Sequence, residues 1–172
     1  MQRRQAGFTM IELVITIVVV GILAALAIPG FSAWIQNQQI RTGTEGVLNG
    51  LQTARAEAVK RNQLVEFRLG DRTAWDVVLR TTNETLQTRA ADEGSRTAVT
   101  AIQPDGATTV TFNGMGWVVA NEDGSPTISQ VDVSSSVLTG TEARPLRVVL
   151  TSGGSTKMCD PQVANDDPRA CP

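Results

Sequence analysis

The chain has 172 residues, with 15 lysines and arginines against 17 aspartates and glutamates, and it contains neither histidine nor tyrosine. The absence of histidine excludes histidine-based metal sites and Ser-His-Asp or Cys-His catalytic groups. Serine, threonine and carboxylate side chains are scattered without a base partner. The sequence therefore predicts a protein that is not an enzyme and that needs no cofactor or metal.

The N-terminal stretch places two arginines, a glycine and a long apolar run in that order. From Phe8 to Ile28, directly after Gly7, the only ionisable side chain is Glu12. As a helix, these 21 residues would be about 31 Å long, which is enough to cross the hydrocarbon core of a membrane. Because basic residues stay on the cytoplasmic side, we expect the bulk of the chain to lie outside the cytoplasm.

Glu12 is the exception within this run. A carboxylate inside a spanning helix costs roughly 2.5–3.5 kcal/mol, so its presence needs a reason. A cut between Gly7 and Phe8 would give Phe8 a free α-amine, four residues before Glu12 on the same helical face. The amine of a neighbouring copy could then neutralise the carboxylate, which would make Glu12 an assembly residue. The alternative is a carboxylate that snorkels to the membrane surface without a partner.

The stretch Gly7-Phe8-Thr9-Met10-Ile11-Glu12, followed by an apolar helix, resembles the class III signal of type IV prepilins and type II secretion pseudopilins. The family consensus is G-F-T-L-I-E, and Met10 replaces its leucine. The resemblance implies that a prepilin peptidase in the inner membrane cuts after Gly7 and methylates Phe8. It also implies that Glu12 serves assembly, that other pilins or pseudopilins bind the N-terminal helix, and that Pro29 follows the membrane segment.

A competing interpretation of the same stretch is an ordinary secretory signal. Ala25-Leu26-Ala27 is an A-x-A site, and cleavage after Ala27 would release a soluble secreted protein. The apolar run, however, exceeds the usual length of such a signal, and a glutamate inside it is unusual. We therefore favour the prepilin interpretation.

Beyond Pro29, apolar residues recur at spacings of three and four, which is typical of an amphipathic helix. These positions are Val47, Leu48, Leu51, Ala54, Ala58 and Val59. We expect one long helix from about Phe8 to Arg61, bent at Pro29 and ending at Asn62. We also expect Gly43, Gly46 and Gly50 to loosen it.

Two further stretches resemble the GspH/FimT branch of these proteins, which contains minor pilins and minor pseudopilins. Residues 51–62 match L-x-x-A-R-x-E-A-x-x-R-N, and residues 112–116 match F-x-x-x-G. The resemblance implies a pilin-like α+β fold, in which a long N-terminal helix packs on a small, mostly antiparallel β domain.

After Asn62 the apolar period changes toward two, which indicates strands. We expect six to eight strands in two small sheets, and residues 81–95 to form a polar loop. The predicted strands are 64–69, 74–79, 97–102, 108–112, 117–120, 128–133, 146–150 and 156–159. The predicted organisation is a leader at 1–7, a transmembrane and assembly helix at 8–29, an amphipathic helix half at 30–62 and a β domain at 63–172.

The C-terminal tail contains both cysteines of the chain. An exported domain lies in an oxidising compartment, so we expect Cys159 and Cys171 to form a disulfide, worth about 3 kcal/mol in the chain-entropy model. Asp160, Asp166 and Asp167 could offer oxygen ligands to calcium, but their spacing matches no calcium-binding loop that we can derive. A solvated acidic tail is the better interpretation.

DNA binding is an alternative function, because some FimT-like minor pilins are DNA receptors with a G-R-x-R element before the last cysteine-bearing strand. This chain has Gly154-Ser155-Thr156-Lys157 there, so serine replaces the first arginine and lysine replaces the second. The candidate phosphate contacts are Arg144, Arg147, Lys157 and Arg169. Without the two leader arginines, 13 basic and 17 acidic residues give a net charge of −4, which argues against a broad DNA-binding surface.

The sequence thus predicts a minor pilin or pseudopilin, a structural subunit that primes or caps a type IV pilus or a type II secretion pseudopilus. We expect a single-pass inner-membrane protein with a periplasmic C-terminal domain, which then enters the pilus or pseudopilus. The alternatives are a DNA-binding minor pilin in DNA uptake and a soluble protein cut after Ala27.

Overall fold

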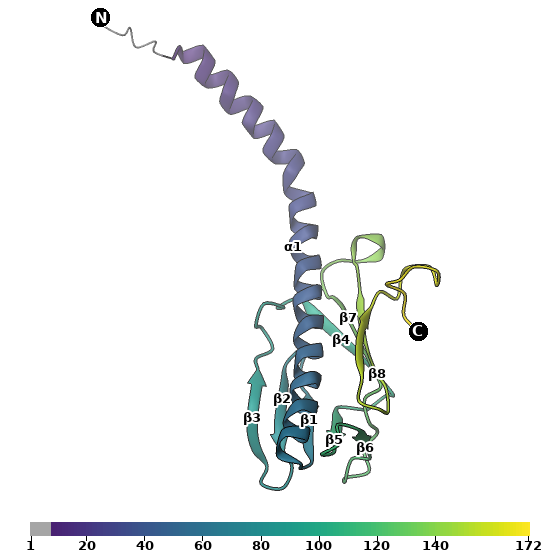
Figure 1. Cartoon of the computed structure of the whole chain (residues 1–172). Coiled ribbons are helices and arrows are strands. Elements are labelled where there is room, and N and C mark those ends of the chain that lie inside the picture. The colour runs from purple at the N-terminus through teal and green to yellow at the C-terminus, as the bar shows by residue number, and fades with distance from the viewer. Residues whose placement is uncertain (1–7) are drawn as a thin grey trace, which may run out of the picture. The chain divides into compact units, whose positions relative to one another are not determined.

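The computed structural model describes residues 8–172, apart from the side chains of residues 27–29 (Figure 1). The predicted leader, including Gly7, lies outside the described residues. The chain divides into two compact units, one ending at Ile35 and the other running from Gln36 to Pro172. We describe each unit separately.

The helix α1 spans Met10–Arg61 and ends where the sequence predicts. Asn62 adopts a left-handed backbone conformation with φ 52°. The N–H of Gln63 donates to the carbonyl of Ala58 at 3.2 Å, and the N–H of Asn62 donates to the carbonyl of Val59 at 3.3 Å. These bonds form a Schellman motif, in which asparagine supplies the left-handed residue that stops the helix.

The three glycines expected to loosen α1 do not interrupt it, since the helix is continuous across them. At Gly50, an added Cβ would lie 2.6 Å from the Phe67 ring and 2.7 Å from the Trp75 ring. At Gly46, it would lie 2.7 Å from the Arg89 guanidinium. The glycines therefore let strands and loops approach the helix closely, and the prediction of local loosening is wrong.

The part of α1 from Gln36 onward buries an apolar stripe at helical spacing. Five of its side chains are at most 1% exposed: Ile40, Val47, Leu51, Ala54 and Ala58. Leu48 is only partly buried against this core, and Val59 is 51% exposed. The predicted stripe is thus confirmed except at its edge, where Val59 faces outward.

The first sheet has five antiparallel strands in the order β3-β2-β1-β5-β6. They are β1 (Val65–Leu69), β2 (Trp75–Leu79), β3 (Glu84–Arg89), β5 (Thr109–Phe112) and β6 (Val118–Val119). Phe67 of β1 lies opposite Val77 of β2 and Val110 of β5, and all three are fully buried. This row of side chains forms the centre of the face that packs on α1.

The second sheet has four antiparallel strands in the order β4-β7-β8-β9. They are β4 (Ala98–Gln103), β7 (Gln130–Ser135), β8 (Leu146–Leu150) and β9 (Thr156–Cys159), with a short 3-10 helix at Gly140–Glu142. Val131, Val133 and Val148 join the same core as the α1 stripe and the first sheet. The α+β, two-sheet prediction is therefore confirmed.

The strand β3 is the main departure from the predicted elements, because it lies inside the expected 81–95 loop. Its residues are exposed or half-buried throughout, so it shows no alternation of apolar and polar side chains. As an edge strand it pairs through its main chain with β2, and apart from Leu86, which packs partly against the core, its side chains are polar. With β3 added, the described chain has nine strands rather than six to eight, and the predicted strand 117–120 shortens to the two-residue β6.

Candidate assembly surfaces

The start of α1 is capped by the predicted assembly residue. The Glu12 carboxylate Oε2 accepts hydrogen bonds from the N–H and the hydroxyl of Thr9, each at 2.9 Å. The N–H of Glu12 donates back to the Thr9 hydroxyl at 3.3 Å. This reciprocal pair is a capping box, which satisfies main-chain donors at the helix end. Glu12 therefore stabilises its own helix in the isolated chain.

The first half of α1 presents apolar side chains on every side. All of its large apolar residues from Phe8 to Leu26 are exposed, from 49% at Val19 to 89% at Phe8. Within the described residues, no single helix meets the length and hydropathy criteria for a membrane span, although Met10–Leu26 and Gly30–Arg61 meet them together. A helix without a polar face has to be covered by lipid or by other helices.

The two stretches that resemble the GspH/FimT branch meet at Arg55. Its guanidinium Nε donates to the carbonyl oxygen of Gly116 at 3.0 Å. A Cβ on Gly154 would lie 2.1 Å from the same oxygen, and the N–H of Val118 donates to the carbonyl of Ser152 at 3.1 Å. Arg55 thus ties α1 to the β5–β6 turn, and the β8–β9 turn packs against both.

The C-terminal tail folds back on β9. Cys159 and Cys171 form a disulfide with an S–S distance of 2.09 Å. Asp160 bridges to Ala170, and its N–H donates to the Arg169 carbonyl at 2.8 Å. The tail is thus closed into a loop whose two ends are held together. Among the described residues, no group of three or more carboxylate or cysteine side chains is placed to hold a metal ion.

The four candidate DNA-contacting residues do not form one basic surface that is free of acidic partners. Arg147 pairs with Asp132 through two bonds of 2.6 and 3.2 Å. Arg169 pairs with Asp167 through bonds of 3.0 and 2.7 Å, and its side-chain hydrogen bond holds the Asp167 pKa down at about 2. Neutralised arginines contribute little to phosphate binding.

The other two candidates differ in their surroundings. Lys157 Nζ donates to the carbonyl of Ala170 at 3.4 Å, so it faces the tail. Arg144 is exposed, and its main-chain N–H donates to the Asn37 side chain at 2.9 Å. Arg144 therefore belongs to the loop beside the Gln36 end of the packed helix, whereas Lys157 lies on β9.

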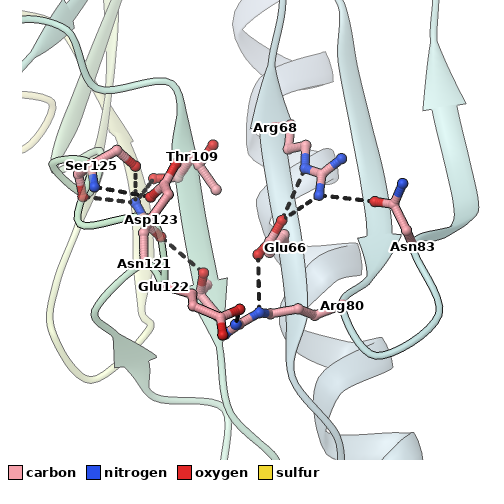
Figure 2. Close-up of polar contacts among 10 residues, drawn as sticks. Glu66, Arg68, Arg80, Asn83, Thr109, Asn121, Glu122, Asp123 and Ser125 are labelled. Atoms are coloured by element: carbon pink, nitrogen blue, oxygen red, sulfur yellow. Dashed lines mark hydrogen bonds and ion pairs between the residues drawn. The ribbon is translucent and has the colours of Figure 1, made fainter.

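A polar cluster covers part of the outer face of the five-stranded sheet (Figure 2). The Glu66 carboxylate, 12% exposed, accepts two bonds from Arg68 at 2.9 and 2.7 Å and a contact from Arg80 at 3.5 Å. Arg80 also pairs with Glu122, and the Asn121 side chain bonds the backbone and the hydroxyl groups around it. Glu66 is thus neutralised twice, and the cluster links β1 to the 121–123 loop.

One surface was not predicted from the sequence. A groove, hereafter the helix–strand groove, is lined by Gln52, Arg55, Ala56, Val59 and Lys60 of α1 and by Gly154, Ser155 and Thr156. The two walls lie nearly 100 residues apart in the chain, so periodicity does not reveal their contact.

Two family models match the chain. The model for type II transport protein GspH matches residues 44–154, and the model for the prokaryotic N-terminal methylation motif matches residues 2–28. The first covers most of the packed unit, and the second covers the leader and the apolar run.

Individual relatives match shorter regions. A type IV major fimbrial protein FimA of Dichelobacter nodosus is 42% identical over 57 residues, which is 33% of this chain and 35% of that protein. A second FimA of the same organism is 46% identical over 43 residues, or 25% and 27% of the two chains. The match therefore spans about a third or less of these relatives.

A solved structure matches over a longer range. The type IV minor pilin FimU of Pseudomonas aeruginosa superposes with a TM-score of 0.50, covering 72% of this chain and 92% of that chain. Sequence identity is 16%, so this similarity shows a common fold alone.

Proposed function

Because the chain belongs to the GspH family of type II transport proteins, we propose that it is a minor subunit of a type IV pilus or a type II secretion pseudopilus. One observation carries this proposal: the large apolar side chains from Phe8 to Leu26 are all exposed, with Glu12 as the only carboxylate among them. Such a surface suits lipid before assembly and the helices of other subunits afterwards. The packed unit then forms the part of the subunit outside the membrane.

The processing steps follow from the methylation motif. A prepilin peptidase removes residues 1–7 by cutting after Gly7 and then methylates the new N-terminus at Phe8. Thr9 is the capping residue of α1, so the cut leaves one residue ahead of the cap and the helix start intact. Residues 8–29 hold the subunit in the inner membrane, 30–62 continue the helix, and 63–172 complete a periplasmic domain.

Glu12 directs assembly through its carboxylate. The two hydrogen bonds that this carboxylate accepts from described residues both go to Oε2, and Oε1 accepts none from them. The positively charged N-terminus of a neighbouring subunit, at its own Phe8, is the partner we assign to Glu12 after assembly. Pairing removes the cost of an isolated carboxylate among apolar helices.

A Glu12→Ala substitution tests this function. We expect the variant to be processed and to remain in the membrane, while its incorporation into filaments falls at least about tenfold, because a desolvated ion pair is lost. Thr16→Ala is the matched control. It removes a hydroxyl that lies one helical turn after Glu12 and that, among the described residues, bonds only to the carbonyl of Leu13, three residues earlier in the same helix. Normal filament incorporation of Glu12→Ala would defeat the assignment.

A further inference from the structure

The apolar run of α1 ends without a charged boundary. It is uninterrupted as far as Ile28, a polar stretch starts at Gln36, and Arg41 is the first ionisable residue after Glu12. The mixed segment between Ile28 and Gln36 covers about 10 Å of helix, a third of the thickness of a hydrocarbon core. Charge therefore does not fix which part of this segment lies at a membrane surface, and another feature has to do so.

Two aromatic side chains lie in this segment, one helical turn apart. Phe31 is 62% exposed and Trp34 is 57% exposed, and their rings stack with centroids 5.8 Å apart and planes at 23°. Ile35 lies on the same face of the helix and is 37% exposed. Because the chain leaves all three side chains uncovered, its own fold gives no reason for a stacked aromatic pair here.

The chemistry of the pair suits the boundary between lipid and water. Tryptophan combines an apolar ring system with one N–H donor, and it is enriched at membrane surfaces, at the level of the lipid headgroups. The Trp34 N–H donates to no group in the described part of the chain, so lipid oxygens can accept it. Phe31, which has no polar atom, lies nearer to the apolar run. The order of apolar run, phenylalanine, tryptophan and Gln36 follows the change from hydrocarbon to water.

The pair continues the surface that has to be covered from outside the chain. The large apolar side chains from Phe8 to Leu26 are at least 49% exposed, and such a helix needs lipid or other helices around it. Phe31 follows Leu26 by five residues in the same helix. Before assembly a subunit has no neighbouring helices, so lipid is the cover for both parts of this surface.

We propose that the Phe31–Trp34 pair is a lipid-binding anchor. It lies among the headgroups on the periplasmic side of the inner membrane and sets the depth of α1 before assembly. The inference rests on the proposed function, because it requires the apolar half of α1 to span that membrane. It adds the lipid interface as the partner of a segment that follows the spanning run.

The anchor also determines where Glu12 lies. Glu12 precedes Trp34 by 22 residues, which is about 33 Å along a helix. This length is close to the thickness of the hydrocarbon core, so a Trp34 ring at one membrane surface puts the Glu12 carboxylate at the other. The carboxylate is hydrated there, and only the transfer of the subunit into a filament brings it among apolar helices. Trp34 and Glu12 thus mark the two ends of the segment that lies in lipid.

Fluorescence quenching by brominated lipids tests the anchor. The full-length chain is reconstituted into vesicles of phosphatidylcholine and phosphatidylglycerol, with bromine on the acyl chains either near the headgroup or near the chain end. Trp117→Phe leaves Trp34 as the reporter, and Trp34→Phe leaves Trp117 as the matched control, since these side chains are 57% and 58% exposed. Both variants retain Trp75, which is 4% exposed and contributes the same background.

We expect quenching at least about threefold stronger in Trp117→Phe than in Trp34→Phe, because Trp34 alone lies in the lipid interface. Bromine near the headgroup should quench Trp34 more than bromine near the chain end. Equal quenching of the two variants would overturn the proposal, since Trp34 would then be no closer to lipid than a turn of the packed unit. Stronger quenching from the chain end would also overturn it, because Trp34 would lie inside the hydrocarbon.

Moving the tryptophan along the helix tests whether the anchor sets the depth. Gly30→Trp with Trp34→Gln moves it one turn toward Glu12, to a position where an added Cβ would meet nothing within 4 Å. Trp34→Gln with Gln38→Trp moves it one turn the other way, to an exposed position on the same face. Met10→Cys, added to each variant, reports the depth of the helix start. Its rate of reaction with a water-soluble maleimide is measured in inverted inner-membrane vesicles, whose outer surface is the cytoplasmic one.

The first shift should draw residue 10 about 6 Å into the membrane and slow its labelling at least about threefold relative to Met10→Cys alone. The second shift moves the helix start further into water and should leave the rate unchanged. The oxidised Cys159–Cys171 pair does not react with the maleimide. Equal labelling rates in the two shifted variants would contradict a depth-setting role for the pair.

Flotation of the reconstituted vesicles separates this inference from the proposed function. If the chain does not float with the vesicles, it has not entered the bilayer, and the proposed function and the inference both fail. If the chain floats but Trp34 is quenched no more than Trp117, only the anchor is overturned.

Discussion

The two halves of α1 contain similar apolar residues with opposite surroundings. From Phe8 to Leu26 every large apolar side chain is at least 49% exposed, whereas five apolar residues between Ile40 and Ala58 are at most 1% exposed. The second half has one apolar stripe and a polar remainder, so the sheets of the same chain can cover it. The first half is apolar all round, and no single sheet face could cover it. The way in which apolar side chains are distributed around the helix, rather than their number, therefore decides whether sheets of the same chain can bury them.

The glycines of the two halves show the same contrast. A Cβ on Gly21 would meet nothing within 4 Å, whereas a Cβ on Gly50 would lie 2.6 Å from Phe67 and 2.7 Å from Trp75. Gly50 is therefore required by contacts inside the chain, and Gly21 is not.

The largest expected effect comes from truncating one buried leucine of the second half of α1 to alanine, with an exposed leucine of the first half as the comparison. Leu51→Ala should lower the free energy of unfolding of the packed unit by about 2–5 kcal/mol, because it leaves a cavity in the core. Leu23→Ala should leave it unchanged, since Leu23 is 61% exposed. Denaturant unfolding of the full chain in detergent, followed by circular dichroism, measures both. Equal losses from the two variants would break the comparison.

A smaller effect is expected when a methyl group is added to each glycine. Gly50→Ala should destabilise the packed unit by about 1–3 kcal/mol, because the helix has to move away from two aromatic rings. Gly21→Ala should have no effect on that unit and should favour helix in its own half. The same unfolding experiment tests this pair. A Gly50→Ala variant as stable as the wild type would mean that the close approach is not needed.

The smallest effect concerns the tail, which belongs to neither helix half. The Asp167 pKa lies at about 2 because Arg169 donates a side-chain hydrogen bond to it. A lowered carboxyl pKa stabilises the fold above about pH 4 and loses that contribution as the pH falls toward 2. Asp167→Asn should therefore flatten the pH dependence of unfolding over this interval. Asp166→Asn is the control, since Asp166 makes no ion pair with any residue between 8 and 172. Identical pH profiles for wild type and Asp167→Asn would contradict the role of the pair.

Sequence reasoning succeeded where local pattern determines structure. The end of α1 at Asn62 depends on one residue type at a helix terminus, and most strands follow apolar alternation. Sequence reasoning missed β3, because an edge strand held by main-chain bonds needs few apolar side chains, and β3 has only Leu86. It misread Gly50, because a close helix–sheet approach depends on the partner residues Phe67 and Trp75.

The candidate sites divide in the same way. The N-terminal methylation motif is contiguous, so it could be recognised from the sequence, and the roles of Gly7 and Glu12 within it stay predictions. The helix–strand groove joins Lys60 to Ser155, residues from distant segments that only the fold brings together. The ion pairs of Arg147 and Arg169 with carboxylates also depend on strand register and loop closure, which the sequence pattern does not specify.

The most direct test of the central claim is the intact mass and N-terminal sequence of the chain from isolated membranes. A processed pilin-like subunit should begin at Phe8 and carry one extra methyl group on its amine. A soluble chain that begins at Ile28 would show that the Ala25-Leu26-Ala27 site was used. That result would remove Glu12 from the mature protein and contradict the assignment as a pilus or pseudopilus subunit.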